Sequence, residues 1–235
     1  MTAAPDLEIR DLVVSGDTGR LLLDVPGLSI AAGEAVCLRG ASGAGKTTLL
    51  HVIAGLVAPR QGQVLWAGRD IAAMPAHAAA DFRRRHVGFV FQEHLLFDEL
   101  TAAGNAALAA CYAPRRDRAT IRASARTALD RLGVAARADA RSAFLSGGER
   151  QRVAVARALA GEPTVILADE PTASLDRANA DRLTADLVGL ARGLGRTLIV
   201  ASHDPHLHAA VDRVIDLADG RLAAPAPTEV VCHAV

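Results

Sequence analysis

The sequence predicts an α/β fold in which a helical segment interrupts the sheet-forming parts of the chain. Short apolar strands alternate with helical stretches in both halves, whereas residues 102–160 show no clear strand and are rich in alanine, arginine and leucine. Residues 40–47 read Gly-Ala-Ser-Gly-Ala-Gly-Lys-Thr, a complete G-x-x-x-x-G-K-[ST] motif, between an apolar strand and a helix. This context favours a phosphate-binding loop and a nucleotide-binding core.

The N-terminal part of the chain reads mostly as strands. Leu7–Val14 alternates apolar and polar residues, and Gly and Asp at 15–19 indicate a turn after it. Further short strands are expected at 21–23, 28–30, 36–38, 62–66 and 87–91. A helix is expected over 48–54, where Gly55 ends it.

The remaining helices and strands are predicted from the spacing of apolar residues and from turn-forming residues. Apolar residues at nearly 3.6-residue spacing predict a helix over 117–133. Strands are predicted at 164–168 and 197–201 with a helix over 177–192, and Asp219-Gly220 between 214–217 and 221–222 is a hairpin signal. The tail at 223–235 contains two prolines and is expected to be flexible.

Composition excludes several classes of protein. The 235 residues allow one sizeable core, and 26 acidic against 26 basic residues leave no basic field for nucleic acid. No run of 18 apolar residues occurs, and residues 1–6 do not resemble a signal peptide, so we expect a cytoplasmic chain. Three scattered cysteines fit neither a metal site nor a disulfide framework, and Cys37 is expected in a buried strand.

The glycine-rich loop has a direct physical reading. Glycines let backbone N–H groups turn toward an anion, and the following helix adds the positive end of its dipole. Lys46 can reach the β- and γ-phosphates and the Thr47 hydroxyl can ligate Mg²⁺. The residues expected to hold nucleotide here are Gly40, Ser42, Gly43, Ala44, Gly45, Lys46, Thr47 and Thr48.

Two carboxylates end the apolar strand at 164–168. α/β sheets bind ligands at the carboxyl ends of their strands, which is where Asp169 and Glu170 fall. Asp169 suits the surroundings of Mg²⁺, and Glu170 could orient or deprotonate a water near the γ-phosphate. Such a pair is common in ordinary loops, and only the phosphate loop in the same chain makes it a strong signal.

A third motif reads Leu-Ser-Gly-Gly-Glu at 145–149 and opens a helix expected over 153–160. Alone it would be an ordinary helix start. The Ser146 hydroxyl and exposed amides of Gly147 and Gly148 can nevertheless bind anionic oxygen at a helix N-terminus.

Together these motifs resemble the ATP-binding-cassette (ABC) ATPases, from about Leu7 to Leu222 and in the order of that family. The resemblance implies a P-loop core at about 1–91 and 161–222, an antiparallel β-subdomain and a helical subdomain at about 92–160, all in one ATPase domain at 1–222. It implies ATP and Mg²⁺ as cofactors and two composite ATP sites in a head-to-tail dimer.

The resemblance also implies a role for each site residue. Glu170 is the general base, His203 holds the γ-phosphate and the attacking water, and Lys46 and Gln92 complete the catalytic set. Thr47, Gln92 and Asp169 surround the metal ion. The nucleotide held by the partner protomer is contacted by Ser146, Gly147, Gly148 and Glu149, with Asp176 at the dimer seam.

The chain departs from the family pattern at the adenine. The family places an aromatic residue near the end of the first strand, but here that region reads Val13-Val14-Ser15-Gly16, and no Phe, Tyr or Trp precedes Trp66. Base stacking is therefore expected to be weak, with relaxed discrimination between ATP and GTP.

Residues 92–101, 148–159 and 168–172 are similar to one subgroup, the separate ATPase subunits of lipoprotein-releasing and macrolide-exporter systems. The subgroup implies a homodimer that drives a separate membrane subunit from the cytoplasmic face, with docking near residues 92–101. Gly104-Asn105 departs from its usual Glu-Asn. The alternatives are a soluble ABC ATPase, an importer or phosphonate-related ATPase, and a non-hydrolysing binding module, which Glu170 and His203 argue against.

Overall fold

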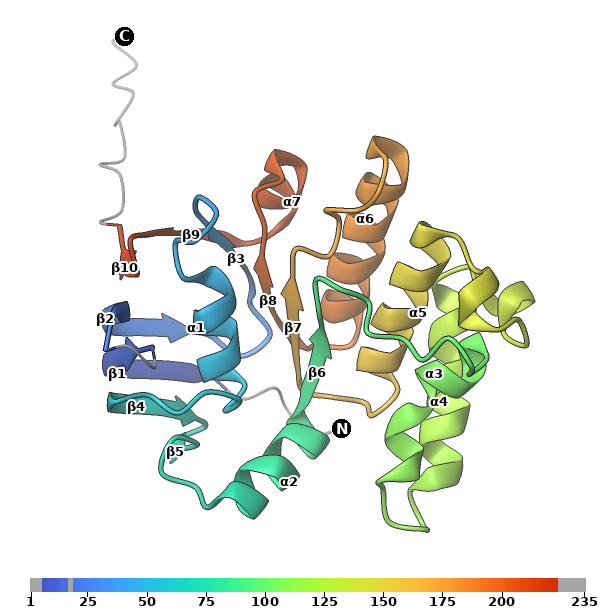
Figure 1. The fold of residues 1–235 in the computed structure, drawn as a ribbon, viewed down its shortest axis with the longest axis horizontal. Helices are drawn as coiled ribbons and strands as arrows, with labels where there is room; N and C mark the ends of the chain where they lie inside the picture. The colour runs from blue at the N-terminus through green and yellow to red at the C-terminus, as the bar shows by residue number, and fades with distance from the viewer. Residues whose placement is uncertain (1–5, 17–18, 224–235) are drawn as a thin grey trace, which may run out of the picture.

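The computed structural model describes residues 6–16 and 19–223, and from residue 224 onward the predicted flexible tail lies outside the described residues. Two sheets make up the framework. A four-stranded antiparallel sheet has the order β2-β1-β4-β5, and a six-stranded sheet has the order β10-β9-β3-β8-β7-β6. In Figure 1, helix α1 lies between the two sheets, and α3, α4 and α5 lie on the opposite side of the larger one. The predicted antiparallel β-part and α/β core are both confirmed.

The strands of the antiparallel sheet are β1 (Leu7–Ser15), β2 (Leu21–Ile30), β4 (Gln61–Trp66) and β5 (Arg69–Asp70). The strands of the six-stranded sheet are β3 (Ala35–Arg39), β6 (Val87–Val90), β7 (Val165–Asp169), β8 (Thr197–Ala201), β9 (Arg213–Ala218) and β10 (Arg221–Leu222). Strands β3, β6, β7, β8 and β9 are parallel, and β10 pairs antiparallel with β9 across the predicted Asp219-Gly220 turn.

The helices are α1 (Lys46–Ile53), α2 (Ala76–His86), α3 (Ala102–Ala106), α4 (Arg118–Arg131), α5 (Gly147–Leu159), α6 (Arg177–Gly193) and α7 (Pro205–Ala210). Short 3₁₀ turns occupy Leu108–Cys111, Ala135–Arg137 and Ser142–Phe144.

The parallel sheet is covered on both faces, and its strands show this by alternation. In β7, Val165 and Leu167 join the buried cluster that contains α1, whereas Ile166 and Ala168 join the cluster that contains α5 and α6. Successive strand residues point to opposite faces, so a strand buried on both sides is apolar throughout. This arrangement fixes the strand ends, and with them the residues that follow β3, β7 and β8.

Several elements differ from the sequence prediction. Helix α2 was not predicted, because only Ala79 on it is buried and its sequence shows no apolar stripe. Strand β2 runs unbroken where two short strands were predicted. Its Pro26 is exposed on the edge of the sheet, a position where a missing N–H costs little. Helix α7, which has a single buried residue, Leu207, was also not predicted.

Helix α5 begins six residues earlier than the predicted 153–160. The Ser146 hydroxyl accepts from the Glu149 N–H, and the Glu149 carboxylate accepts from the Ser146 N–H, which together form a capping box. This reciprocal cap extends the helix through Gly147 and Gly148, residues that by themselves weaken a helix.

The helices between β6 and β7 pack on one another and also on the sheet. Val153, Val155 and Ala156 of α5 are fully buried in the same cluster as Ile166 and Val200 of the sheet. Helix α5 is buried on nearly all sides, between the other helices of this segment and the sheet, and so connects the helical segment to the core. None of the helices in the described residues is long and apolar enough to cross a membrane.

Candidate nucleotide-binding site

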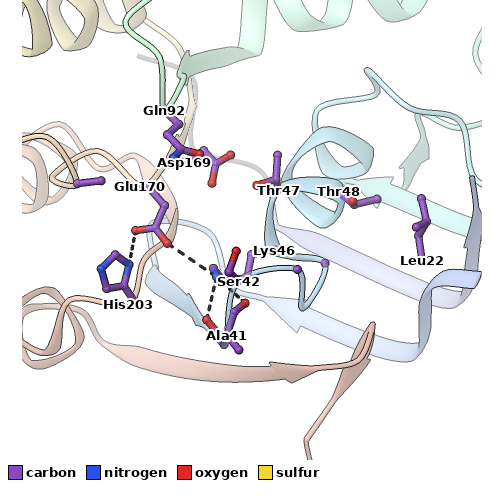
Figure 2. Close-up of a pocket in the computed structure, with 14 residues that line it drawn as sticks. Leu22, Ala41, Ser42, Lys46, Thr47, Thr48, Gln92, Asp169, Glu170 and His203 are labelled. Carbon is purple, nitrogen blue, oxygen red and sulfur yellow. Dashed lines mark hydrogen bonds and ion pairs between the residues drawn. The ribbon is translucent and has the colours of Figure 1, made fainter.

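A cavity of about 550 Å³ opens where β3 and β7 end and α1 begins. Figure 2 shows Lys46, Glu170 and His203 meeting within it, with Thr47 and Asp169 nearby. The residues that line it are Leu22, Gly40, Ala41, Ser42, Gly43, Gly45, Lys46, Thr47, Thr48, Gln92, Asp169, Glu170, Ala173 and His203. The structure thus brings together the phosphate loop, the acidic pair, Gln92 and His203, which are up to 163 residues apart in the sequence.

The loop before α1 requires glycine at two positions for different reasons. Gly45 caps α1 with φ +101°, and a Cβ there would lie 2.7 Å from a Leu23 methyl carbon. At Gly40 a Cβ would lie 2.2 Å from the Leu217 carbonyl oxygen. The loop therefore keeps its shape only with glycine, and its exposed amides at the N-terminus of α1 form an anion site.

Lys46 is held across the mouth of this loop. Its Nζ donates to the carbonyl oxygens of Gly40 at 2.8 Å and Ala41 at 3.1 Å, and lies 3.8 Å from the Glu170 carboxylate. A mostly buried ammonium with a single distant carboxylate can bind a further anion.

Glu170 stands between a cation and an imidazole. Its carboxylate lies 2.9 Å from His203 Nδ1, on the other side from Lys46. Its backbone has φ +43°, and its N–H donates to the Ala201 carbonyl at 2.8 Å, which holds the residue in this sparsely populated conformation. The His203 side chain is 72% exposed, so the pair faces the open side of the cavity.

The surroundings of Asp169 are better suited to a carboxylate that binds a metal ion than to a carboxylate without a ligand. Burial raises the pKa of its carboxyl, while a hydrogen bond from the Thr47 side chain opposes this and the charge of Glu170 adds to it. Its Oδ1 is buried with no hydrogen-bond partner among the described residues. An unpartnered buried carboxylate oxygen beside a threonine hydroxyl is the type of oxygen ligand that Mg²⁺ takes.

The third motif lies at a second, separate cavity of about 400 Å³ that shares no lining residue with the first. Ser146, Gly147, Gly148, Glu149 and Asp176 line it. Asp176 also caps α6, accepting from the Asn179 N–H at 3.0 Å, and this backbone hydrogen bond is the largest of the contacts that lower its pKa. Within one chain, the structure does not bring these predicted residues to the phosphate loop.

One residue that was predicted to hold nucleotide does not line the cavity, and three residues that line the cavity were not predicted from the sequence. Ala44 does not line the cavity, and its N–H donates to the Ala41 carbonyl. Leu22, Ala41 and Ala173 were not predicted. Ala41 falls at an unspecified position of the motif, and Leu22 and Ala173 carry no chemical group that a sequence pattern could reveal.

The lining of the first cavity contains no aromatic side chain other than the imidazole of His203 among its 14 described residues. Trp66, which comes first among the aromatic residues of the chain, is fully buried and donates its indole N–H to the Ile53 carbonyl at 2.9 Å. Trp66 is therefore part of the core and cannot stack on a base in the cavity. Leu22 is the largest apolar side chain in the lining, so it is the one that can contact a base.

Comparison with known proteins agrees with this geometry. The family model described as ABC transporter matches residues 23–173. Two relatives are described as lipoprotein-releasing system ATP-binding protein LolD. The one from Syntrophotalea carbinolica is 43% identical over 92% of this chain and 96% of its own length. The one from Ruegeria pomeroyi is 46% identical over 92% of this chain and 95% of its own length.

A third relative, the macrolide export ATP-binding/permease protein MacB 1/2 of Paracoccus denitrificans, is 40% identical over 95% of this chain, which covers 34% of that longer protein. Among solved structures, the dimeric ATP-binding cassette MJ0796 bound to ADP and Pi superposes with a TM-score of 0.83 at 30% identity, covering 93% of this chain and 97% of that one. The family match and the superposed structure thus agree on the family and the fold of this chain.

Proposed function

The chain belongs to the ABC transporter family and is an ATP-binding ATPase, and on that premise we propose that it is the ATPase subunit of a machine that works on a separate membrane subunit. The observation that carries the proposal is the first cavity, in which an anion-binding loop, a lysine and a glutamate–histidine pair converge.

Each side chain has a place in hydrolysis under this proposal. The loop amides and Lys46 bind the β- and γ-phosphates. Glu170 accepts a proton from the attacking water, and His203, 2.9 Å away, orients that water and the γ-phosphate. The 3.8 Å contact between Lys46 and Glu170 holds the base beside the phosphate site.

We assign Thr47, Asp169 and Gln92 to Mg²⁺. All three line the same cavity, and the buried Asp169 Oδ1 lacks a partner among the described residues. When bound, Mg²⁺ supplies charge neutralisation at the phosphate oxygens.

The separation of the two cavities favours a head-to-tail homodimer. Ser146 and its neighbours line a different cavity from Lys46, so the serine-led tip of α5 serves the nucleotide of a partner protomer. The solved cassette with a TM-score of 0.83 is a dimer with ADP and Pi, in keeping with this assembly. Residues 1–91 with 161–222 form the core and residues 92–160 the helical subdomain in this proposal.

The relatives favour a lipoprotein-release or export system, with the chain peripheral on the cytoplasmic face of the cell membrane. Relatives that the chain spans almost fully are lipoprotein-releasing ATP-binding proteins, and a longer one is a macrolide export ATP-binding/permease protein. The docking site falls at residues 92–101, where Leu95 and Phe97 are 53% and 52% exposed. Leu96 between them packs into the core, and Arg157 donates to the carbonyls of His94 and Leu95, which fixes the segment.

A capture experiment tests the membrane proposal. The chain purified from its native membranes should bring an integral membrane protein, and that protein, reconstituted in lipid, should change the ATPase rate. Phe97→Ser should lose the partner, whereas Leu56→Ser, which alters a side chain that is 46% exposed just after α1 and outside residues 92–101, should keep it. An ATPase rate that no co-purified membrane protein and no lipid alters would refute the proposal.

Asp169→Asn should have opposite effects on stability and on activity. At neutral pH it should raise the melting temperature of the nucleotide-free protein, because it removes a buried charge whose Oδ1 has no partner in the described part of the chain. Since burial raises the pKa of Asp169 above its unfolded value, the cost of the charge acts above that pKa and disappears as the pH falls through it. The melting-temperature difference should therefore narrow in acid, while Mg²⁺-dependent hydrolysis is lost. Calorimetry at several pH values measures this, and a variant that melts lower at neutral pH would contradict it.

The lack of an aromatic side chain in the cavity predicts weak selection of the base. Stacking on an aromatic ring contributes about 1–3 kcal/mol per base, and Leu22 offers only aliphatic contact. We expect kcat/KM for ATP and GTP to differ by less than about tenfold in a competition assay. A strong preference for ATP would show that the base is recognised by another group.

A further inference from the structure

A third cavity lies on the face formed by α4 and the end of α6. It has a volume of about 260 Å³ and shares no lining residue with either cavity described above. Its walls come from four places: helix α4, the last residue of α5 (Leu159), the Glu162-Pro163 connection before β7, and residues 190–196 at and just beyond the end of α6. It therefore spans the boundary between the helical segment and the sheet.

Two arginines line this cavity. Arg196 is only 8% exposed and Arg131 extends from the last turn of α4. Among the described residues that line this cavity, none accepts a side-chain hydrogen bond from either guanidinium. No nitrogen of Arg196 is among the buried unpartnered atoms of the described residues, and Arg131 is exposed, so both guanidinium groups can be reached from the cavity. An anion that enters the cavity can therefore accept charge-assisted hydrogen bonds from them.

The single carboxylate that lines the cavity already accepts a hydrogen bond from within the chain. Glu162 Oε1 accepts from the Ser124 hydroxyl at 2.7 Å, and no ion pair within 4.0 Å joins Glu162 to either arginine. Two guanidinium groups against one carboxylate leave the lining with an excess of positive charge. The charge favours an anion.

The rest of the lining is largely aliphatic. Ala128, Leu159, Pro163, Leu190 and Leu194 contribute to it. Small-molecule sites combine an apolar wall with a few polar groups that fix orientation. The volume of this cavity falls just below the range for drug-sized ligands, so its occupant must be smaller than those.

We propose that this cavity is a binding site for a small organic anion, a carboxylate or phosphate monoester carried on a short apolar chain, with Arg196 and Arg131 holding the anionic group. The apolar chain lies against the leucines of α5 and α6. The site is distinct from the ATP site and does not depend on the function proposed above.

Titration calorimetry with a matched set of probes tests the proposal. Hexanoate and hexyl phosphate are titrated into the full chain with saturating ADP present, so that the phosphate loop is occupied. Both should bind, and hexanol and hexylammonium should bind at least about tenfold more weakly, because they lack the anionic group.

Substitutions in the lining of the cavity test whether the anions bind there. Arg131→Gln, at the exposed end of α4, and Arg196→Gln should each weaken the anions by about tenfold or more. Thr127→Trp, on the exposed rim, should block the cavity without disturbing the core, which covers the case in which Arg196→Gln does not fold. Arg126→Gln, on the same helix but outside the cavity, should change nothing. No binding of either anion up to about 10 mM, equal binding of hexanol, or full binding by both Arg131→Gln and Thr127→Trp would overturn the proposal.

Discussion

Glu170→Gln should lower the steady-state rate of ATP hydrolysis by about a thousandfold, because an amide cannot accept the proton of the attacking water. Nucleotide affinity should be kept or rise. Glutamine keeps the size of the side chain between Lys46 and His203, and it removes a negative charge 3.8 Å from the lysine that faces the γ-phosphate. Unhydrolysed ATP should then hold two protomers together, visible as a doubling of mass in light scattering.

A matched control is Glu8→Gln, which makes the same change at a carboxylate on β1 whose side chain is 46% exposed and does not line the cavity, and it should leave the rate unaltered. If Glu170→Gln hydrolysed ATP at the full rate, the base would have to be sought elsewhere. If it lost activity without forming the ATP-bound dimer, the base assignment would stand and the assembly would be in doubt.

The sequence could predict those site residues that directly follow a buried strand or belong to a fixed motif. Asp169 and Glu170 follow a strand that is apolar on both faces, and a buried parallel strand presents its next residues at the ligand edge of the sheet. The same logic applies to Gln92 after β6 and His203 after β8. The structure adds the distances, such as the 2.9 Å contact between Glu170 and His203, which no spacing rule gives.

What could not be predicted depends on tertiary packing. Helix α2 has one buried residue and no apolar stripe, so its helicity rests on alanine-rich composition and on contacts such as Arg83 Nη1 with the Gly55 carbonyl at 2.7 Å. Leu22 and Ala173 line the nucleotide cavity only because the strand β2 and the loop after β7 approach it in space. Arg196 and Arg131 lie 65 residues apart in the sequence and share a cavity for the same reason.

Two inactive variants should restore activity when mixed, if each site is shared between chains. Lys46→Ala removes the ammonium that faces the phosphates. Gly147→Asp places a carboxylate at the tip of α5, where a Cβ meets nothing within 4 Å, so the variant should fold while its tip repels phosphate. Each alone should lose at least about a hundredfold in rate. In an equal mixture, half of the dimers are mixed and each has one intact site of two, so about a quarter of the wild-type activity should return.

The control uses the geometry of the first cavity. Lys46 and Glu170 lie 3.8 Å apart within one chain, so they belong to the same site whatever the assembly. A mixture of Lys46→Ala with Glu170→Gln contains no intact site in any dimer and should stay inactive, whereas the mixture with Gly147→Asp should recover. If Gly147→Asp alone hydrolysed ATP normally, the site would be complete within one chain, and the tip of α5 would be a helix cap with no part in ATP hydrolysis.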